Sequence, residues 1–185
     1  IQHYLPKIEK SRILESLKLR KNDYFLVTAH RAENVDNKTS LRNIFLGLEK
    51  ISKTFRKKII YPIHPRTMSK INKLEIPKGI KLINPLGFFD FSKLEKNSFC
   101  LITDSGTIPE EALFFQKPCV TIRTTTERPE IIEAGSNILS GLSPENILQS
   151  TQTITSKKPD WQWNKALGDG KTARKVLNIL GGNLY

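Results

Sequence analysis

Short apolar runs recur along the chain and predict the strands of a single sheet. The first run, residues 24–30 (YFLVTAH), is apolar on both faces rather than alternating. Strands of this kind are typical of parallel sheets that helices cover on both sides. Five further runs have the same character, at residues 58–64, 80–84, 99–103, 118–123 and 136–139.

The segments between these runs carry the three-to-four-residue period of helices. Residues 40–55 place Leu41 and Ile44 on one apolar face, and Ser143 followed by Pro144 is the start signal of another helix. Further helices are expected over residues 66–74, 91–96, 107–115 and 170–180. Strands alternating with helices, joined by right-handed crossovers, predict an α/β fold with a Rossmann-like, doubly wound parallel sheet.

Both ends of the chain depart from this alternation. Residues 1–19 begin with a loop-like piece around Pro6 and continue as a helix with Ile13 and Leu14 turned inward. Residues 156–170, with two tryptophans, are expected to form a loop packed on the edge of the domain. A total of 185 residues fits one domain of ordinary size.

The net charge of +12 raises the question of nucleic-acid binding. The lysines are spread along the chain, however, and no arginine-rich tract or patch with interleaved aromatics is present. We therefore expect no nucleic-acid partner, and part of the excess charge suits an anionic diphosphate. No apolar run reaches membrane-spanning length and no secretory segment opens the chain, so we expect no membrane partner and a cytoplasmic location.

Cysteine and histidine give no sign of a metal site. Cys100 and Cys119 fall inside predicted strands, where they are expected to be small core residues rather than a disulfide or a catalytic thiol. His3, His30 and His64 are too scattered for a zinc motif.

The informative polar residues lie just after the strands, where ligands bind in such folds. His30 and Arg31 follow the first strand, and either can pair with phosphate oxygens. The alternative is that His30 bonds a loop and Arg31 is a surface charge. After the second strand, His64 and Pro65 precede helix amides that suit an anion, which alone is a weak signal.

The strongest local signal follows the fourth strand, in the sequence TDSGTIPEEA of residues 103–112. A Ser-Gly turn before a helix places amides and a hydroxyl at one point, which favours phosphate. One of the two carboxylates can reach back to ribose hydroxyls. The alternative is ordinary capping, in which Ser105 or Thr107 caps the helix and Glu110 completes a capping box. After the fifth strand, Arg128 either clamps a phosphate or carboxylate or lies in a solvated loop.

Several common enzyme motifs are missing from the sequence. It contains no nucleophile elbow, no Walker loop and no Gly-x-Gly-x-x-Gly. This argues against a hydrolase, a kinase or a simple dehydrogenase.

Taken together, the motifs closely resemble those of the non-hydrolysing UDP-N-acetylglucosamine 2-epimerases. The matching stretches are TAHRAEN, HPRT, GFFDF (residues 87–91), TDSGTIPEEA and TTERPE with the following Glu133-Ala134-Gly135. The resemblance runs from about Tyr4 to the end of the chain. It implies one half of a GT-B-type two-domain enzyme, with residues 1–185 as the C-terminal UDP-binding domain and the N-terminal domain absent from this chain.

The resemblance also implies roles for individual residues. By it, Ser105, Gly106 and Thr107 hold the diphosphate, Glu111 binds the ribose hydroxyls and Phe91 contacts uracil. His30 acts in catalysis beside the leaving diphosphate, and His64 and Arg128 line the phosphate and sugar end.

The implied reaction is elimination of UDP followed by its re-addition. A base removes the C2 proton of UDP-GlcNAc, a glycal forms, and UDP returns after C2 is protonated on the opposite face to give UDP-ManNAc. The resemblance implies that the acid and base carboxylates come from the N-terminal half. It also implies that no nicotinamide, metal or other cofactor is needed, and that the full-length enzyme is a homodimer.

Two features keep other sugars and reactions open. Thr107 stands where the usual family pattern has a second glycine. Epimerases of 6-deoxy UDP-hexosamines share similar HPRT and SGT segments, and GT-B glycosyltransferases share the Ser-Gly turn and acidic helix. TTTERPE followed by Glu-Ala-Gly favours UDP-GlcNAc.

Overall fold

A computed structural model of the chain describes residues 1–71, 74–163 and 167–182. Its centre is a six-stranded sheet in the order β3-β2-β1-β4-β5-β6, and every neighbouring pair is parallel. The strands are β1 (Tyr24–Thr28), β2 (Lys58–Pro62), β3 (Ile80–Ile83), β4 (Cys100–Thr103), β5 (Cys119–Thr121) and β6 (Asn137–Leu139). This order is that of the doubly wound Rossmann fold, which confirms the fold class predicted from the sequence.

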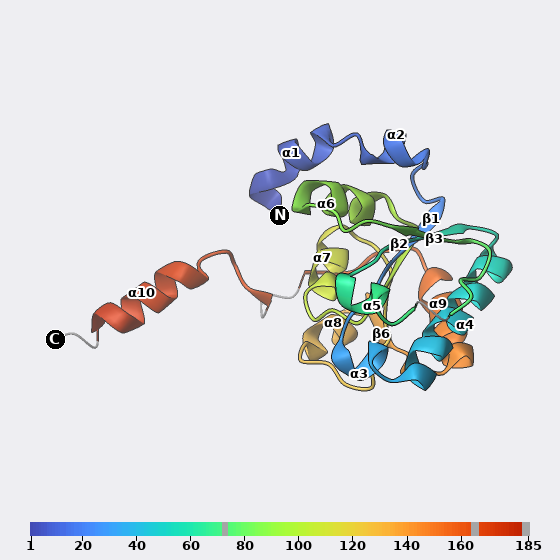
Figure 1. Cartoon of the computed structure of the whole chain (residues 1–185). Helices are drawn as coiled ribbons and strands as arrows, with labels where there is room; N and C mark the ends of the chain where they lie inside the picture. The colour runs from blue at the N-terminus through green and yellow to red at the C-terminus, as the bar shows by residue number, and fades with distance from the viewer. Residues whose placement is uncertain (72–73, 164–166, 183–185) are drawn as a thin grey trace.

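Helices cover both faces of the sheet (Figure 1). Those before β3 are α1 (Leu5–Lys10), α2 (Ile13–Leu17), α3 (Ala32–Val35), α4 (Lys38–Phe55) and α5 (Pro65–Met68). Those after it are α6 (Phe88–Asn97), α7 (Ile108–Phe114), α8 (Pro129–Glu133), α9 (Pro144–Thr155) and α10 (Thr172–Gly182).

The central strand β1 divides its side chains between two cores. Phe25 and Val27 join the cluster that α4 and α9 cover, whereas Tyr24 and Leu26 join the cluster that α2, α6 and α7 cover. Successive residues of a strand point to opposite faces, so this double burial explains why the run is apolar without alternation.

The long helix α4 begins earlier than the apolar period alone predicts. The side chain of Asn37 accepts hydrogen bonds from the backbone N–H groups of Thr39 and Ser40, which caps the first turn. The helix ends at Arg56, whose backbone is left-handed. Ser143 caps α9 in the same way, as predicted, by accepting from the N–H of Asn146.

Three sequence expectations need correction. Pro6 lies in the first turn of α1 rather than in a loop, because proline has no N–H that the first turn would use. The helix expected over residues 66–74 ends at Met68, and the Ser69 hydroxyl donates to the Arg66 carbonyl just after it. Residues 72–73 of this expectation lie outside the described residues. The short helices α3 and α8 were not anticipated, because four or five residues carry no readable period.

The segment after α9 lies along the edge of the domain, as expected. Gln116 donates a hydrogen bond to the carbonyl of Trp161 at 2.9 Å and accepts one from its N–H at 3.3 Å. Residues 164–166 of this segment lie outside the described residues. Beyond it, α10 leads away from the sheet, with Leu177, Ile179 and Leu180 exposed (Figure 1).

The described part of the chain also shows the state of the cysteines and can be searched for membrane-spanning helices and metal-ligand clusters. Cys100 and Cys119 are buried and unpaired, as predicted. Among residues 1–71, 74–163 and 167–182, no helix is both long and apolar enough to cross a bilayer. The same residues contain no cluster of three or more metal-ligating side chains.

Candidate functional site

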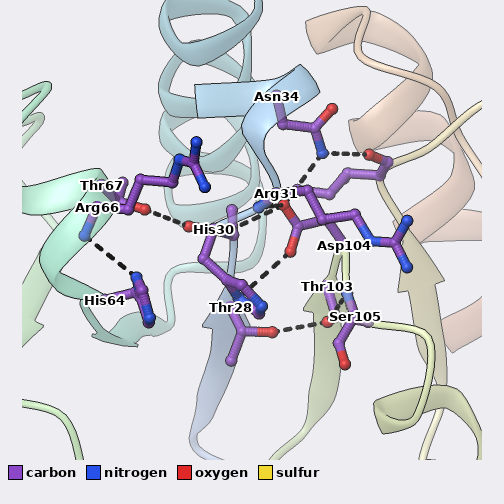
Figure 2. Close-up of polar contacts among 12 residues, drawn as sticks. Thr28, His30, Arg31, Asn34, His64, Arg66, Thr67, Thr103, Asp104 and Ser105 are labelled. Atoms are coloured by element: carbon purple, nitrogen blue, oxygen red, sulfur yellow. Dashed lines mark hydrogen bonds and ion pairs between the residues drawn. The ribbon is translucent and has the colours of Figure 1, made fainter. Parts of the chain in front are cut away.

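The carboxyl ends of β1 and β4 bring two of the sequence motifs together. Thr28 and Thr103 are partners in the sheet register, and their hydroxyl oxygens lie 2.6 Å apart. The loop that carries His30 therefore faces the turn that begins at Asp104 (Figure 2). The sequence predicted this meeting because parallel strands end at the same edge.

Asp104 organises the loop that follows β1. It is fully buried, and its Oδ2 accepts hydrogen bonds from the backbone N–H groups of His30 and Arg31 at 2.9 and 2.8 Å and from the Asn34 amide at 3.1 Å. Its Oδ1 has no hydrogen-bond partner among the described residues and lies 3.6 Å from Nδ1 of His30. Sequence reasoning quoted Asp104 only as part of a motif and gave it no role. The sequence did offer one signal for this role, because Asp104 is an acidic residue placed directly after an apolar strand.

Buried hydroxyl groups fix the same loop from the side of β2. Tyr61 and Thr67 both donate to the carbonyl of Ala29, each at 2.6 Å. Ala29 directly precedes His30, so the backbone at the base of the histidine is held by β2 and α5 as well as by β4. Figure 2 shows Thr67 of α5 and Asp104 of the turn after β4 on either side of His30. The imidazole itself remains 42% exposed.

His30 and His64 form a pair at the mouth of the site. Their ring centroids are 5.3 Å apart. Nδ1 of His64 accepts a hydrogen bond from the backbone N–H of Arg66 at 3.1 Å, which caps α5. An accepting Nδ1 carries no proton, so Nε2 of His64 is left as a donor for a ligand.

The Ser-Gly-Thr turn after β4 is not buried: Ser105 is partly exposed and Thr107 is exposed. Ser105 Oγ lies 3.3 Å from both the hydroxyl and the backbone nitrogen of Thr107. Thr107 precedes α7 without a side-chain cap, and Glu110 pairs with Arg128. The capping-box alternative is therefore wrong.

Arginines and carboxylates surround this turn. A side chain added at Gly106 would point toward Arg31 and Glu127, at 3.6 and 3.8 Å. Arg123 grips Glu127 with two hydrogen bonds of 2.8 and 2.7 Å, and this contact lowers the pKa of Glu127 to about 2. Arg31 has only longer contacts, 3.7 Å to Glu127 being one of them. Arg31 is therefore less tightly held by acidic partners than Arg123.

Arg128, which sequence reasoning assigned to a phosphate or carboxylate clamp, is engaged within the chain. Its guanidinium is hydrogen-bonded to the carboxylate of Glu110. A phosphate that reached Arg128 would compete with this carboxylate.

A second part of the site lies beside α7. A pocket of about 1070 Å³ is lined by Thr107, Glu110 and Glu111, with Gln2 and Trp163 among its other lining residues. Burial raises the pKa of Glu111. Phe91, the residue expected to contact uracil, is half-buried on the neighbouring helix α6 and is not one of the described residues that line this pocket. The predicted residues thus fall into two groups, with His30, His64 and Ser105 at the strand ends and Glu111 in the adjoining pocket.

The site can therefore hold an extended anionic ligand. The amides of Ser105 and Thr107 are used by Thr103 Oγ1 and Ser105 Oγ. Hydroxyl groups, the amide of Gly106 and a histidine donor remain at the strand ends, where they suit phosphate oxygens. The adjoining pocket offers a carboxylate, which suits neutral hydroxyl donors.

Comparison with known protein families gives one assignment. The family described as UDP-N-acetylglucosamine 2-epimerase matches residues 1–181. The UDP-N-acetylglucosamine 2-epimerase of Methanococcus maripaludis is 46% identical over 172 residues, which are 89% of this chain and 46% of that protein. The enzyme of the same name from Methanocaldococcus jannaschii is 43% identical over 165 residues, or 86% of this chain and 44% of that protein.

Solved structures agree with the sequence matches. The Methanocaldococcus jannaschii UDP-GlcNAc 2-epimerase in complex with UDP-GlcNAc and UDP superposes with a TM-score of 0.86 at 40% identity, over 97% of this chain and 51% of that one. The UDP-N-acetylglucosamine 2-epimerase of Rickettsia bellii gives 0.87 at 34% identity, over 98% and 50%. The chain spans about half the length of the relatives it matches.

Proposed function

Because the chain belongs to the UDP-N-acetylglucosamine 2-epimerase family, we propose that it is the UDP-binding half of an enzyme that interconverts UDP-GlcNAc and UDP-ManNAc. The observation that carries the proposal is the meeting of His30 with the Ser105–Thr107 turn at one sheet edge, beside a pocket that contains Glu111. The relative from Methanocaldococcus jannaschii was solved with UDP-GlcNAc and UDP, which supports the same ligands here.

The strand ends hold the diphosphate in this proposal. Ser105 and Thr107 offer hydroxyls, Gly106 offers a backbone amide, and Nε2 of His64 offers a further donor. Arg31 adds positive charge near the turn, and Arg128 joins once it leaves Glu110. Fixed donors of this kind stabilise charge that builds up on a leaving group.

The pocket beside α7 takes the nucleoside. Glu111 lines it and accepts hydrogen bonds from the ribose hydroxyls, whereas Phe91 on α6 contacts uracil. A carboxylate that accepts from two neighbouring hydroxyls selects for a ribose, which is why the acidic residue suits this position.

His30 acts at the bond that breaks. As the C2 proton leaves, the C1–O bond breaks, a glycal forms and the departing UDP gains negative charge. A histidine near that oxygen stabilises the charge, and Asp104 holds its loop in place. Elimination and re-addition involve no net oxidation, so the reaction needs no redox cofactor.

Other parts of the reaction belong to residues outside this chain. We propose that residues 1–185 form one domain, that a second domain of similar size supplies the acid and base for C2, and that the complete enzyme is a homodimer. Closing the two domains around the sugar excludes water from the glycal. The chain alone is then expected to bind UDP without turnover.

Two measurements test the proposal. Calorimetric titration of the chain with UDP is expected to show saturable binding, and no binding up to millimolar UDP would contradict the proposed ligand. In deuterated water, the protein extended to the length of its relatives is expected to convert UDP-GlcNAc to UDP-ManNAc with deuterium at C2. Conversion without deuterium at C2 would contradict the reaction.

A further inference from the structure

Glu95 is a buried carboxyl group that the proposed function does not use. Its side chain is fully buried. Among the described residues, no N–H or hydroxyl group donates a hydrogen bond to either carboxyl oxygen. It lies one helical turn after Phe91 on α6, so both residues share one face of that helix. A buried acid without donors calls for an explanation.

The group that faces Glu95 is another carboxyl. The side chains of Glu95 and Glu111 lie within hydrogen-bonding reach of each other, across the contact between α6 and α7. The hydroxyl of Ser92 also lies close to Glu95; it is buried and has no hydrogen-bond partner in the described part of the chain. Glu111 in turn lines the pocket assigned to the nucleoside.

The surrounding charges do not favour two ionised carboxylates. Glu110 on α7 adds negative charge beside Glu111. From β5, the buried thiol of Cys119 lies near Glu95. From α1, Glu9 pairs with Lys93 and Lys96, and Lys93 lies on the side of α6 opposite to Glu95.

Two facing carboxyl groups in a buried site hold a proton between them, because like charges at close range repel strongly. Burial raises the pKa of Glu95 well above its usual range, and the charge of Glu111 raises it further. Burial also raises the pKa of Glu111, but the hydrogen bond from Glu95 opposes that rise. The proton therefore belongs on Glu95.

We propose that Glu95 is protonated at neutral pH and donates its O–H to the carboxylate of Glu111, and so positions Glu111 to accept the ribose hydroxyls. Glu95 is thus a positioning residue that acts through Glu111. This role rests on the proposed function, since it assumes that Glu111 binds ribose. The shared proton itself is a property of the free chain.

Infrared spectroscopy tests the proton without any ligand. At pH 7.5, where exposed carboxyl groups are ionised, the chain is expected to show the C=O band of a protonated carboxylic acid. Glu95→Gln is expected to remove that band. Glu49→Gln, on the far helix α4, is expected to keep it. Absence of the band in the wild-type chain, or its persistence in Glu95→Gln, would overturn the inference.

UDP titration tests the positioning role. Glutamine keeps a donor toward Glu111, so Glu95→Gln is expected to bind UDP within about twofold of wild type, whereas Glu95→Met, of similar length but without a donor, loses about fivefold. As pH rises from 7 toward 9, affinity is expected to fall for wild type more than for Glu95→Gln, because only wild type can lose the proton. Equal affinity of all three proteins, with parallel pH profiles, would overturn the positioning role.

These outcomes separate the inference from the proposed function. A chain that shows the protonated carboxyl band but binds no UDP contradicts the proposed ligand and, with it, the positioning role of Glu95. A chain that binds UDP but lacks the band contradicts the shared proton while leaving the UDP site standing.

Discussion

Asp104 and Glu95 are both fully buried acids, yet they have opposite surroundings. Asp104 accepts three N–H hydrogen bonds through one oxygen, which is the environment of an ionised carboxylate. Glu95 has no N–H donor among the described residues and faces the carboxyl of Glu111. Burial alone therefore does not decide whether an acid is charged. The hydrogen-bond donors around the carboxyl group decide it as well.

The two acids also divide the site between them. Asp104 fixes the loop of His30, where the leaving diphosphate is expected, whereas Glu95 stands behind the residue expected to hold ribose. Asp104, the charged acid, accepts hydrogen bonds from N–H groups that come together only when the sheet folds. The neutral acid depends on one side chain across a helix contact.

The largest effect is expected from removing the charged acid. Asp104→Ala leaves the N–H groups of His30, Arg31 and Asn34 without their acceptor, and we expect the free energy of unfolding to fall by about 3 kcal/mol or more. Asp104→Asn keeps an acceptor oxygen and is expected to lose about half as much. Denaturant unfolding measures both.

The matched control for this loss is Asp23→Ala. Asp23 is mostly exposed and contacts Lys57 at 3.7 Å, so its removal is expected to change the free energy of unfolding by at most about 0.5 kcal/mol. A loss in Asp104→Ala no greater than that of the control would show that the three donors find other partners. The contrast between the two buried acids would then disappear.

The second test removes the neutral acid and gives a pH dependence. The folded pKa of Glu95 is raised, so wild-type stability is present below the unfolded pKa and is lost as pH rises toward the folded value. Glu95→Gln has no such loss. Its stability advantage over wild type is expected to grow from about pH 4.5 upward, by at most about 1.4 kcal/mol per pH unit. Unfolding curves at pH 5, 6 and 7 that stay parallel would contradict a raised pKa.

The two acids also show how far sequence reasoning reaches. Apolar runs predict the sheet because β1 buries both of its faces, and the motifs predict the strand ends where His30 and Ser105 meet. The role of Asp104 depends on which strand lies beside β4, and no local pattern encodes that. Glu95 sits between Lys93 and Lys96, as a surface residue would, yet the packing of α6 in the folded chain buries it fully.

A third test asks whether Glu111 serves ribose alone. Glu111→Ala removes the acceptor in the nucleoside pocket and is expected to weaken UDP binding by about tenfold, while pyrophosphate binding changes by less than about twofold. Calorimetric titration with both ligands separates the two effects. Equal losses for UDP and pyrophosphate would mean that Glu111 acts on the phosphates or on the fold, and Glu95 would then have no ribose residue to position.

The smallest expected effect comes from an acid that is neither buried nor free of donors. Glu110 pairs with Arg128, whose side chain is 47% exposed, so the pair is screened by water and worth little by itself. Glu110→Gln should release Arg128 toward the diphosphate and tighten UDP binding by about threefold, with the gain shrinking at high salt. Weaker binding would place Glu110 among the ligand contacts instead. Tighter UDP binding would show that an exposed carboxylate paired with one cation only adjusts the affinity. The two buried acids, by contrast, hold the residues of the site in position.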